Sequence, residues 1–305
     1  MRLTGSGLGC PDWPKCYGRN VPPLDTHAVI EYGNRLLTGF VGFAVIAAAV
    51  GAFFRVPYRW HLALFGILLP IGVMCQAILG ALVVKYHLAP GLVMSHFILS
   101  MFLLDAAFAL AWCSRYEPWE RRRSSDRLGV WAVRGLIPLG QLTILAGTIA
   151  TASGPHAGAH EDELVHRFDF EGTGTLEWVV QRHSAIAAVF GIAVIAVWFL
   201  LRRPGGDRRA LRPLTAVVGL LALQGIVGAV QWSLELPSEL VWLHVALATL
   251  TWLAMLWAVA AAGRLEPTGA EDDSERPPEA EPRAPRWIRS ESLSPRARRS
   301  WPRSC

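Results

Sequence analysis

Seven long apolar stretches constrain this chain more than any other feature of its sequence. A helix needs about 20 mostly apolar residues to cross the hydrocarbon of a bilayer. Stretches of that length occupy residues 34–54, 62–84, 88–113, 131–151, 179–201, 213–232 and 239–262. Charged residues make up only 17% of the chain, which is low for a soluble protein. The sequence therefore predicts an all-α, polytopic membrane helical bundle in a lipid bilayer.

The loops between these stretches differ in charge. Arginines gather after the first, third and fifth stretches, whereas residues 152–178 carry six acidic side chains against the single Arg167. Because basic loops stay in the cytoplasm, we expect the N-terminus outside, the C-terminus inside and a multi-pass protein of the cell (plasma) membrane. The net charge of +5 then reflects topology, and no nucleic-acid partner is required. Residues 263–305 are rich in Pro, Arg, Glu and Ser, which is typical of a disordered cytoplasmic tail.

The chain carries an internal repeat. Gln76-Ala-Ile-Leu-Gly80 resembles Gln224-Gly-Ile-Val-Gly228, and a histidine follows each glutamine after 20 residues. Such duplication predicts two pseudo-symmetric four-helix halves, residues 1–114 and 131–262. The Thr151-Ala-Ser-Gly154 motif follows an apolar stretch, whereas the matching Thr4-Gly-Ser-Gly7 has none before it. We therefore expect an additional first helix upstream, so that seven of eight helices are present.

Three histidines lie at one depth, a few residues inside the outer ends of their stretches: His96, His183 and His244. Ionisable side chains at membrane depth are costly and usually functional. A single histidine on an apolar face is more often a hydrogen-bonded core residue, but three at repeat-related positions favour ligands. Histidines on two helices of a bundle can hold a haem between them. We expect His183 and His244 to form such a pair.

The repeat places Asn34 where the other half has His183. Asparagine is a poor ligand for haem iron, so His96 would hold an iron with one open side, which suits substrate or oxygen chemistry. A decayed site is the alternative. Glu31 lies one helical turn outward of Asn34 and could move protons, or it could be an ordinary interfacial charge.

Cys10 and Cys16 share the short segment before the first stretch. The outside of the membrane is oxidising, so this pair indicates a local disulfide. A metal-binding pair is the alternative.

Three segments resemble the haem A synthase family, together with the histidine layout, over residues 2–262. They are Arg2-Leu-Thr-Gly-Ser-Gly-Leu-Gly-Cys-Pro-Asp-Trp-Pro-Lys-Cys16, Ile30-Glu-Tyr-Gly-Asn-Arg-Leu-Leu-Thr-Gly39 and Ser153-Gly-Pro-His-Ala-Gly158. The resemblance implies an oxidoreductase that oxidises a ring methyl of haem O to a formyl group, giving haem A for terminal cytochrome oxidase. The expected route is successive hydroxylation, followed by loss of water from a gem-diol.

The resemblance also implies a set of site residues and partners. Haem b would be held by His183 and His244 as an electron-transfer centre, substrate haem O would lie against His96, and Glu31 would be catalytic. Cys10 and Cys16 would serve redox transfer or contact with the haem donor, a haem O synthase. The electron partner is left unidentified, and a homo-oligomer is left open. Many members carry histidine where this chain has Asn34, and some carry a second cysteine pair that is missing here.

Two other classes of protein compete with this interpretation. A non-enzymatic membrane b-type cytochrome that carries electrons would need two closed haem sites, and Asn34 argues against it. A transporter built from repeats would show broken helices at mid-membrane, whereas the candidate residues here gather near one face.

Overall fold

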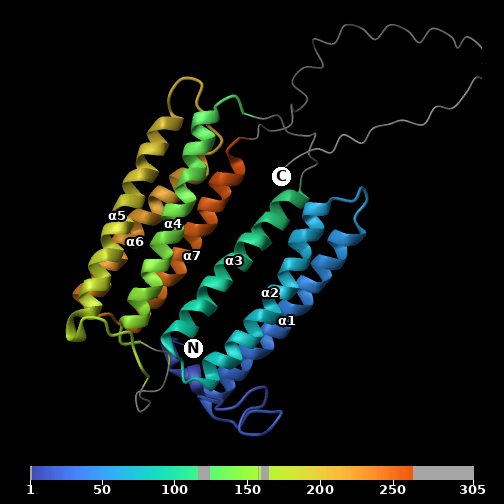
Figure 1. The fold of residues 1–305 in the computed structure, drawn as a ribbon, viewed down its shortest axis with the longest axis vertical. Helices are drawn as coiled ribbons and strands as arrows, with labels where there is room; N and C mark the ends of the chain where they lie inside the picture. Colours follow the sequence, from blue (N-terminus) through green and yellow to red (C-terminus); the bar gives the residue numbers. More distant parts are fainter. Residues whose placement is uncertain (1, 116–123, 157, 159–164, 264–305) are drawn as a thin grey trace, which may run out of the picture.

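The computed structural model describes residues 2–115, 124–156, 158 and 165–263 (Figure 1). Seven helices in this part of the chain are long and apolar enough to cross a membrane, as the sequence predicted. They are α1 (Thr26–Phe54), α2 (Trp60–Lys85), α3 (Pro90–Ser114), α4 (Arg127–Ser153), α5 (Thr175–Leu201), α6 (Leu211–Ser233) and α7 (Ser238–Ala261). The described residues contain no strand, only helices and short 3₁₀ turns: η1 (Arg2–Thr4), η2 (Ser6–Leu8) and η4 (Gly172–Gly174). Except for Gly263, the predicted tail lies outside the described residues.

Several helices begin earlier than the apolar pattern predicted. The first starts at Thr26 and not at 34, because the Asp25 carboxylate caps it by accepting from the His27 and Ala28 N–H groups at 3.0 Å. Asp126 caps α4 in the same way, accepting from the Gly129 N–H at 2.9 Å. Hydropathy marks only the part of a helix that matches the hydrocarbon, whereas capping residues set its first turn. Glu31 therefore lies inside α1.

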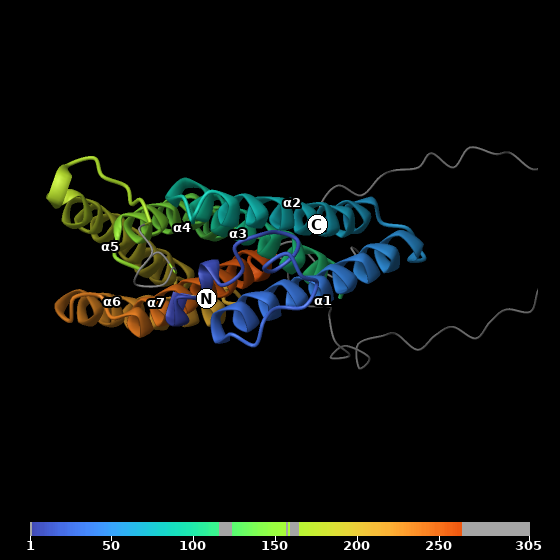
Figure 2. The same cartoon turned by 90° about the horizontal axis from the view of Figure 1, so that it is seen from below.

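The helices form two groups, which Figure 1 shows side by side. In the three-helix group, α2 packs against α1 on one side and α3 on the other. In the four-helix group, α4–α7, each helix packs against two others, so the group closes on itself. The two groups meet where α3 lies against α4 and α7, as Figure 2 shows from the end of the bundle.

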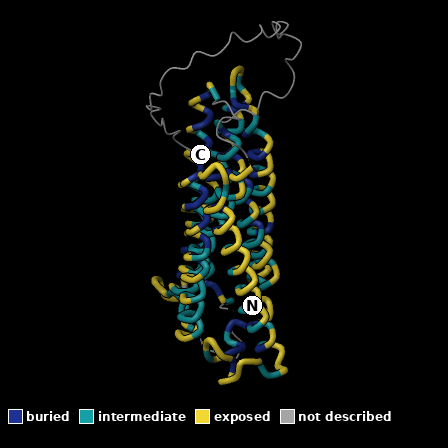
Figure 3. Tube along the Cα trace, turned by 90° about the vertical axis from the view of Figure 1, so that its right-hand side faces the viewer, coloured by how far each residue is buried: buried dark blue, intermediate teal, exposed yellow. Residues whose placement is uncertain are grey.

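The largest buried core belongs to the four-helix group. It is built around Val133, Phe190, Val194, Leu214 and Met255. By contrast, α1 presents large apolar side chains outward, with Phe40 75% and Phe43 76% exposed. Figure 3 shows exposed residues along the full length of the helices. A bilayer would cover such apolar faces.

Polar contacts join the two groups at one end and in the middle. The Trp252 indole N–H of α7 donates to Asp105 of α3 at 2.6 Å, which gives this mid-helix carboxylate a partner. At one end the Gly7 N–H donates to the Gly158 carbonyl at 2.7 Å. The end of the bundle that carries the N-terminal segment is called the cysteine end below, and α1, α3, α5 and α7 all begin there (Figure 1).

Candidate functional site

His183 of α5 and His244 of α7 lie next to each other inside the four-helix group. Their ring centres are 6.3 Å apart and their planes are nearly perpendicular, at 76°. Metal–imidazole bonds are about 2.0 Å long, so an iron held coaxially between two imidazoles would separate the ring centres by roughly 6 Å. The predicted pair is therefore brought together at a spacing that fits a bis-histidine haem.

A glycine of the preceding helix lies against each of the three histidine rings. A Cβ added to Gly147 of α4 would lie 3.1 Å from His183 Cε1, and one added to Gly228 of α6 would lie 3.4 Å from His244 Cε1. Gly80 of α2 faces His96 in the same way, at 3.6 Å. In the sequence, Gly80 and Gly228 are recognisable only as parts of a repeat. Their structural role is to let a helix backbone approach a ring closely.

The three-helix group keeps the same register with one of the two histidines replaced. His96 and His244 each lie six residues after the first residue of their helices, and Asn34 and His183 each lie eight after theirs. Asn34 is exposed on α1, and its carbonyl accepts a hydrogen bond from the Thr38 hydroxyl at 3.1 Å. In the four-helix group, α4 covers the face of α5 that carries His183. Among the described elements, α1 packs mainly against α2 and η2, so the face with Asn34 stays open.

Glu31 has a structural environment that the sequence did not predict. Its side chain is only 3% exposed, and its carboxylate accepts from the Cys10 N–H at 2.6 Å and from Arg35. Arg35 also donates to the carbonyls of Asp12 and Lys15, both at 2.9 Å. The carboxylate and the guanidinium together anchor the N-terminal segment to the second turn of α1. Glu31 is thus enclosed beneath this segment.

Cys10 and Cys16 form a disulfide, which confirms the predicted pairing. Both residues are fully buried and pack against Ala28 of α1. A Cβ at Gly9 would overlap the backbone of His27, so only glycine allows the segment to lie this close to α1. The disulfide loop is therefore fixed over the start of α1.

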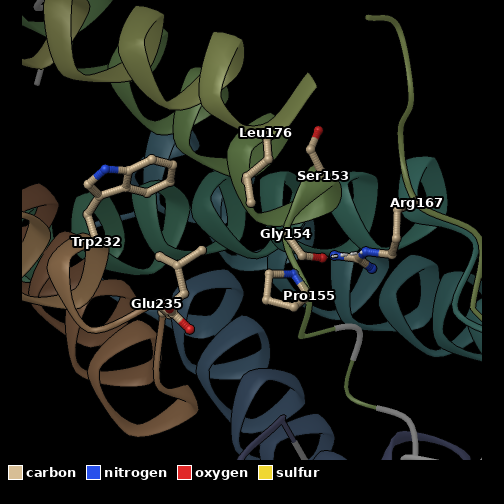
Figure 4. Close-up of a pocket in the computed structure, with 8 residues that line it drawn as sticks. Ser153, Gly154, Pro155, Arg167, Leu176, Trp232 and Glu235 are labelled. Carbon is tan, nitrogen blue, oxygen red and sulfur yellow. Dashed lines mark hydrogen bonds between the residues drawn. The ribbon is translucent and has the colours of Figure 1, made fainter. Parts of the chain in front are cut away.

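A cavity of about 470 Å³ lies at the cysteine end of the four-helix group (Figure 4). It is lined by Ser153, Gly154, Pro155, Arg167, Leu176, Trp232, Glu235 and Leu236. The Arg167 side chain caps the C-terminus of α4. Its Nε donates to the Gly154 carbonyl at 2.6 Å, and its guanidinium also donates to the Thr151 carbonyl. Leu176 lies seven residues before His183 on α5, so the cavity begins about 10 Å along the helix from the histidine pair.

Part of this sequence is similar to a known protein family. The model of a family described as cytochrome oxidase assembly protein (COX15-CtaA) matches residues 25–167. A haem A synthase of an Exiguobacterium species is 34% identical over 100 residues, which is 32% of this chain and 33% of that protein. The haem A synthase of Bacillus pumilus is 35% identical over 111 residues, which is 35% of this chain and 36% of that protein.

Over these residues the chain is similar to haem A synthases. The aligned region spans about a third of the length of these curated relatives. The family match includes Glu31, Asn34 and His96, and it ends before His183 and His244. The seven long apolar helices make this chain a multi-pass membrane protein. The bis-histidine geometry of the four-helix group is therefore an observation independent of the family match.

Proposed function

We propose that the chain is a haem A synthase, an oxidoreductase that converts a ring methyl of haem O to the formyl group of haem A. The observation that carries this proposal is the 6.3 Å separation of the His183 and His244 rings, in a family whose relatives are haem A synthases. A haem b bound there would supply electron transfer, since two axial histidines leave no open position.

The residues of the four-helix group fit such a haem. His183 and His244 would be the axial ligands, and Gly147 and Gly228 leave the rings room to turn toward a common iron. The buried Nδ1 of His183 has no hydrogen-bond partner within the described residues. The haem b site belongs to residues 131–262 in this proposal, and the substrate site belongs to residues 1–114.

Substrate haem O would bind the three-helix group through His96. Because Asn34 supplies no imidazole, the other face of the substrate iron would stay open to oxygen. Glu31 lies one turn from Asn34 and is proposed as the catalytic, proton-handling residue. Its contacts with Cys10 and Arg35 give it a second task, which is to hold the disulfide loop over the start of α1.

The proposed setting is the plasma membrane, with the cysteine end outside and the C-terminus in the cytoplasm. An outer location suits the disulfide, which persists in oxidising compartments. A haem O synthase would deliver the substrate, and cytochrome oxidase assembly would use the product. Reporter fusions in the loops after α1 and α6 test this topology, and cytoplasmic activity for the loop after α6 would contradict it.

Haem extraction from the purified full chain tests the proposed function. The protein is isolated from membranes that contain a haem O synthase, and its haems are separated by chromatography. Haem b together with haem O or haem A supports the synthase. Two haem b per chain would favour the b-type cytochrome, and no haem at all would contradict both. The open face at Asn34 favours the synthase, because a di-haem cytochrome needs two closed sites.

A further inference from the structure

A glutamine lies beside the histidine of the next helix in both groups. In the orientation that satisfies all its neighbours, the Gln224 amide nitrogen donates to His244 Nδ1 at 3.0 Å and to the His244 carbonyl at 3.1 Å. Its amide oxygen accepts from the Ala248 N–H at 2.9 Å. Gln224 is four residues before Gly228 on α6, so the two lie on one helix face and hold the ring between them.

The three-helix group repeats the contact with the histidine carbonyl but not the contact with Nδ1. The Gln76 amide nitrogen donates to the His96 carbonyl at 3.0 Å and to the Ser100 hydroxyl at 2.5 Å. Gly80 follows four residues later and faces the His96 ring. Within the described residues, Gln76 Oε1 and His96 Nδ1 are both buried without a hydrogen-bond partner. An acceptor and a potential donor are thus left unpaired on two residues that already touch.

The Gln224 contact has a consequence for iron binding. A neutral ring whose Nδ1 accepts a hydrogen bond carries its proton on Nε2. An iron at Nε2 needs that lone pair, so the proton must move to Nδ1, and ligating histidines almost always give this proton to an acceptor. The side-chain oxygen of glutamine becomes that acceptor when the amide turns by half a rotation. The turned amide gives up its contacts with the His244 carbonyl and the Ala248 N–H. The haem-free chain therefore favours the Nε2–H tautomer, and iron binding must outweigh the loss of those two contacts.

We propose that Gln224 is a positioning residue that sets the tautomer and orientation of His244, and that Gln76 positions His96 through the His96 carbonyl. In the haem-free chain the amide of Gln224 donates to Nδ1, and in the haem-bound chain its oxygen accepts from Nδ1–H. The haem-bound half of this inference rests on the proposed function, whereas the haem-free half does not.

The tautomer of His244 can be measured without haem. The full chain is purified in detergent with ¹⁵N-labelled histidine, and the His244 signals are assigned by their loss in His244→Asn. We expect the Nε2–H tautomer in the wild-type chain. In Gln224→Glu the carboxylate can only accept, so the ring should change to the Nδ1–H tautomer. Gln76→Glu, which alters the other group, should leave the His244 tautomer unchanged.

Loading with haemin tests the haem-bound half. Gln224→Leu should weaken haemin binding about tenfold, which is the lower end of the losses seen for outer partners of metal-bound histidines. Gln224→Glu should shift the ferric/ferrous equilibrium about tenfold toward ferric, or ~59 mV for one electron. Gln141→Leu and Gln141→Glu are matched controls on the exposed face of α4.

The outcomes separate this inference from the proposed function. If the Gln224 variants match the Gln141 variants in tautomer, haemin affinity and potential, the positioning role is wrong while the proposed function stands. If the wild-type chain takes up no haemin but Gln224→Glu still changes the His244 tautomer, the positioning role is supported and the proposed haem b site is contradicted.

Discussion

The four-helix group and the three-helix group place two polar residues at matching positions along their helices, but only the four-helix group brings them together. In the four-helix group, α4 covers α5, and His183 is held beside His244. In the three-helix group, the equivalent position on α1 is Asn34, which is exposed. The comparison indicates that two residues at matched depth are not enough to bring two side chains together. The four-helix group also has a neighbouring helix that covers His183 and brings Gly147 against its ring.

The largest difference between the groups should appear when histidines are removed. His183→Ala and His244→Ala should each abolish the low-spin haem b spectrum, because either leaves the iron with one protein ligand. His96→Ala should keep that spectrum and lose turnover of haem O. Reduced-minus-oxidised spectra of the purified full chain measure the first effect. If His96→Ala lost as much haem b as His183→Ala, the proposed separation of the haem b site from the substrate site would be wrong.

The next largest effect concerns Glu31 in the three-helix group. In Glu31→Gln, the buried Cys10 N–H and Arg35 lose their charged acceptor, at a cost of about 1–3 kcal/mol. The disulfide loop should then be reduced and alkylated faster under mild reductant, while the haem b spectrum is unchanged. Glu177 in the first turn of α5 is exposed and serves as the matched control. Equal alkylation rates for Glu31→Gln and Glu177→Gln would show that Glu31 does not anchor the loop.

Substitution of the glycines that face the rings should have graded effects. A Cβ at Gly147 lies 3.1 Å from the His183 ring, against 3.4 Å for Gly228 and 3.6 Å for Gly80. Gly147→Ala should therefore weaken haemin binding most, by about tenfold, through a displaced ligand, and Gly228→Ala should do so less. Gly80→Ala should leave haemin binding to the four-helix group unchanged. In Gly191→Ala the added methyl meets open space, so this control should only gain helix stability.

The smallest expected effect is a pH dependence at the opposite end of the four-helix group. Burial alone would raise the pKa of Asp126, but the N–H groups of Gly129 and Asp207 and the Arg203 guanidinium outweigh it and hold the pKa below its ordinary value. A lowered folded-state pKa stabilises the fold above the unfolded value of about 4, and this stabilisation is lost as the pH falls through the folded value.

Asp126→Asn should remove that part of the acid sensitivity. The measurement is the difference in thermal midpoint between wild type and variant in detergent, from pH 7 down to pH 3. The difference should be largest at pH 7 and shrink toward pH 3. A difference that stays constant with pH would mean that the Asp126 charge contributes nothing to the stability of this junction.

The sequence predicted many of the individual site residues but few of the contacts between them. The Cys10–Cys16 pairing could be predicted because six residues of chain bring the two sulfurs within reach of each other. The role of Glu31 as an anchor could not, because it depends on how residues 9–16 fold back onto α1. Asp105 lies in the middle of an apolar stretch, but its partner Trp252 lies 147 residues away and becomes visible only in the fold.

The sequence by itself determined the seven helices and the depth of the histidines along them. Both follow from local rules, since the length of an apolar run and the distance along a helix depend on neighbouring residues alone. Tertiary structure decided which histidine meets which. The rings of His183 and His244 are 6.3 Å apart because α5 and α7 pack within one closed group, and Asn34 stays exposed because α1 does not. Packing between distant segments sets that outcome, and no local pattern encodes it.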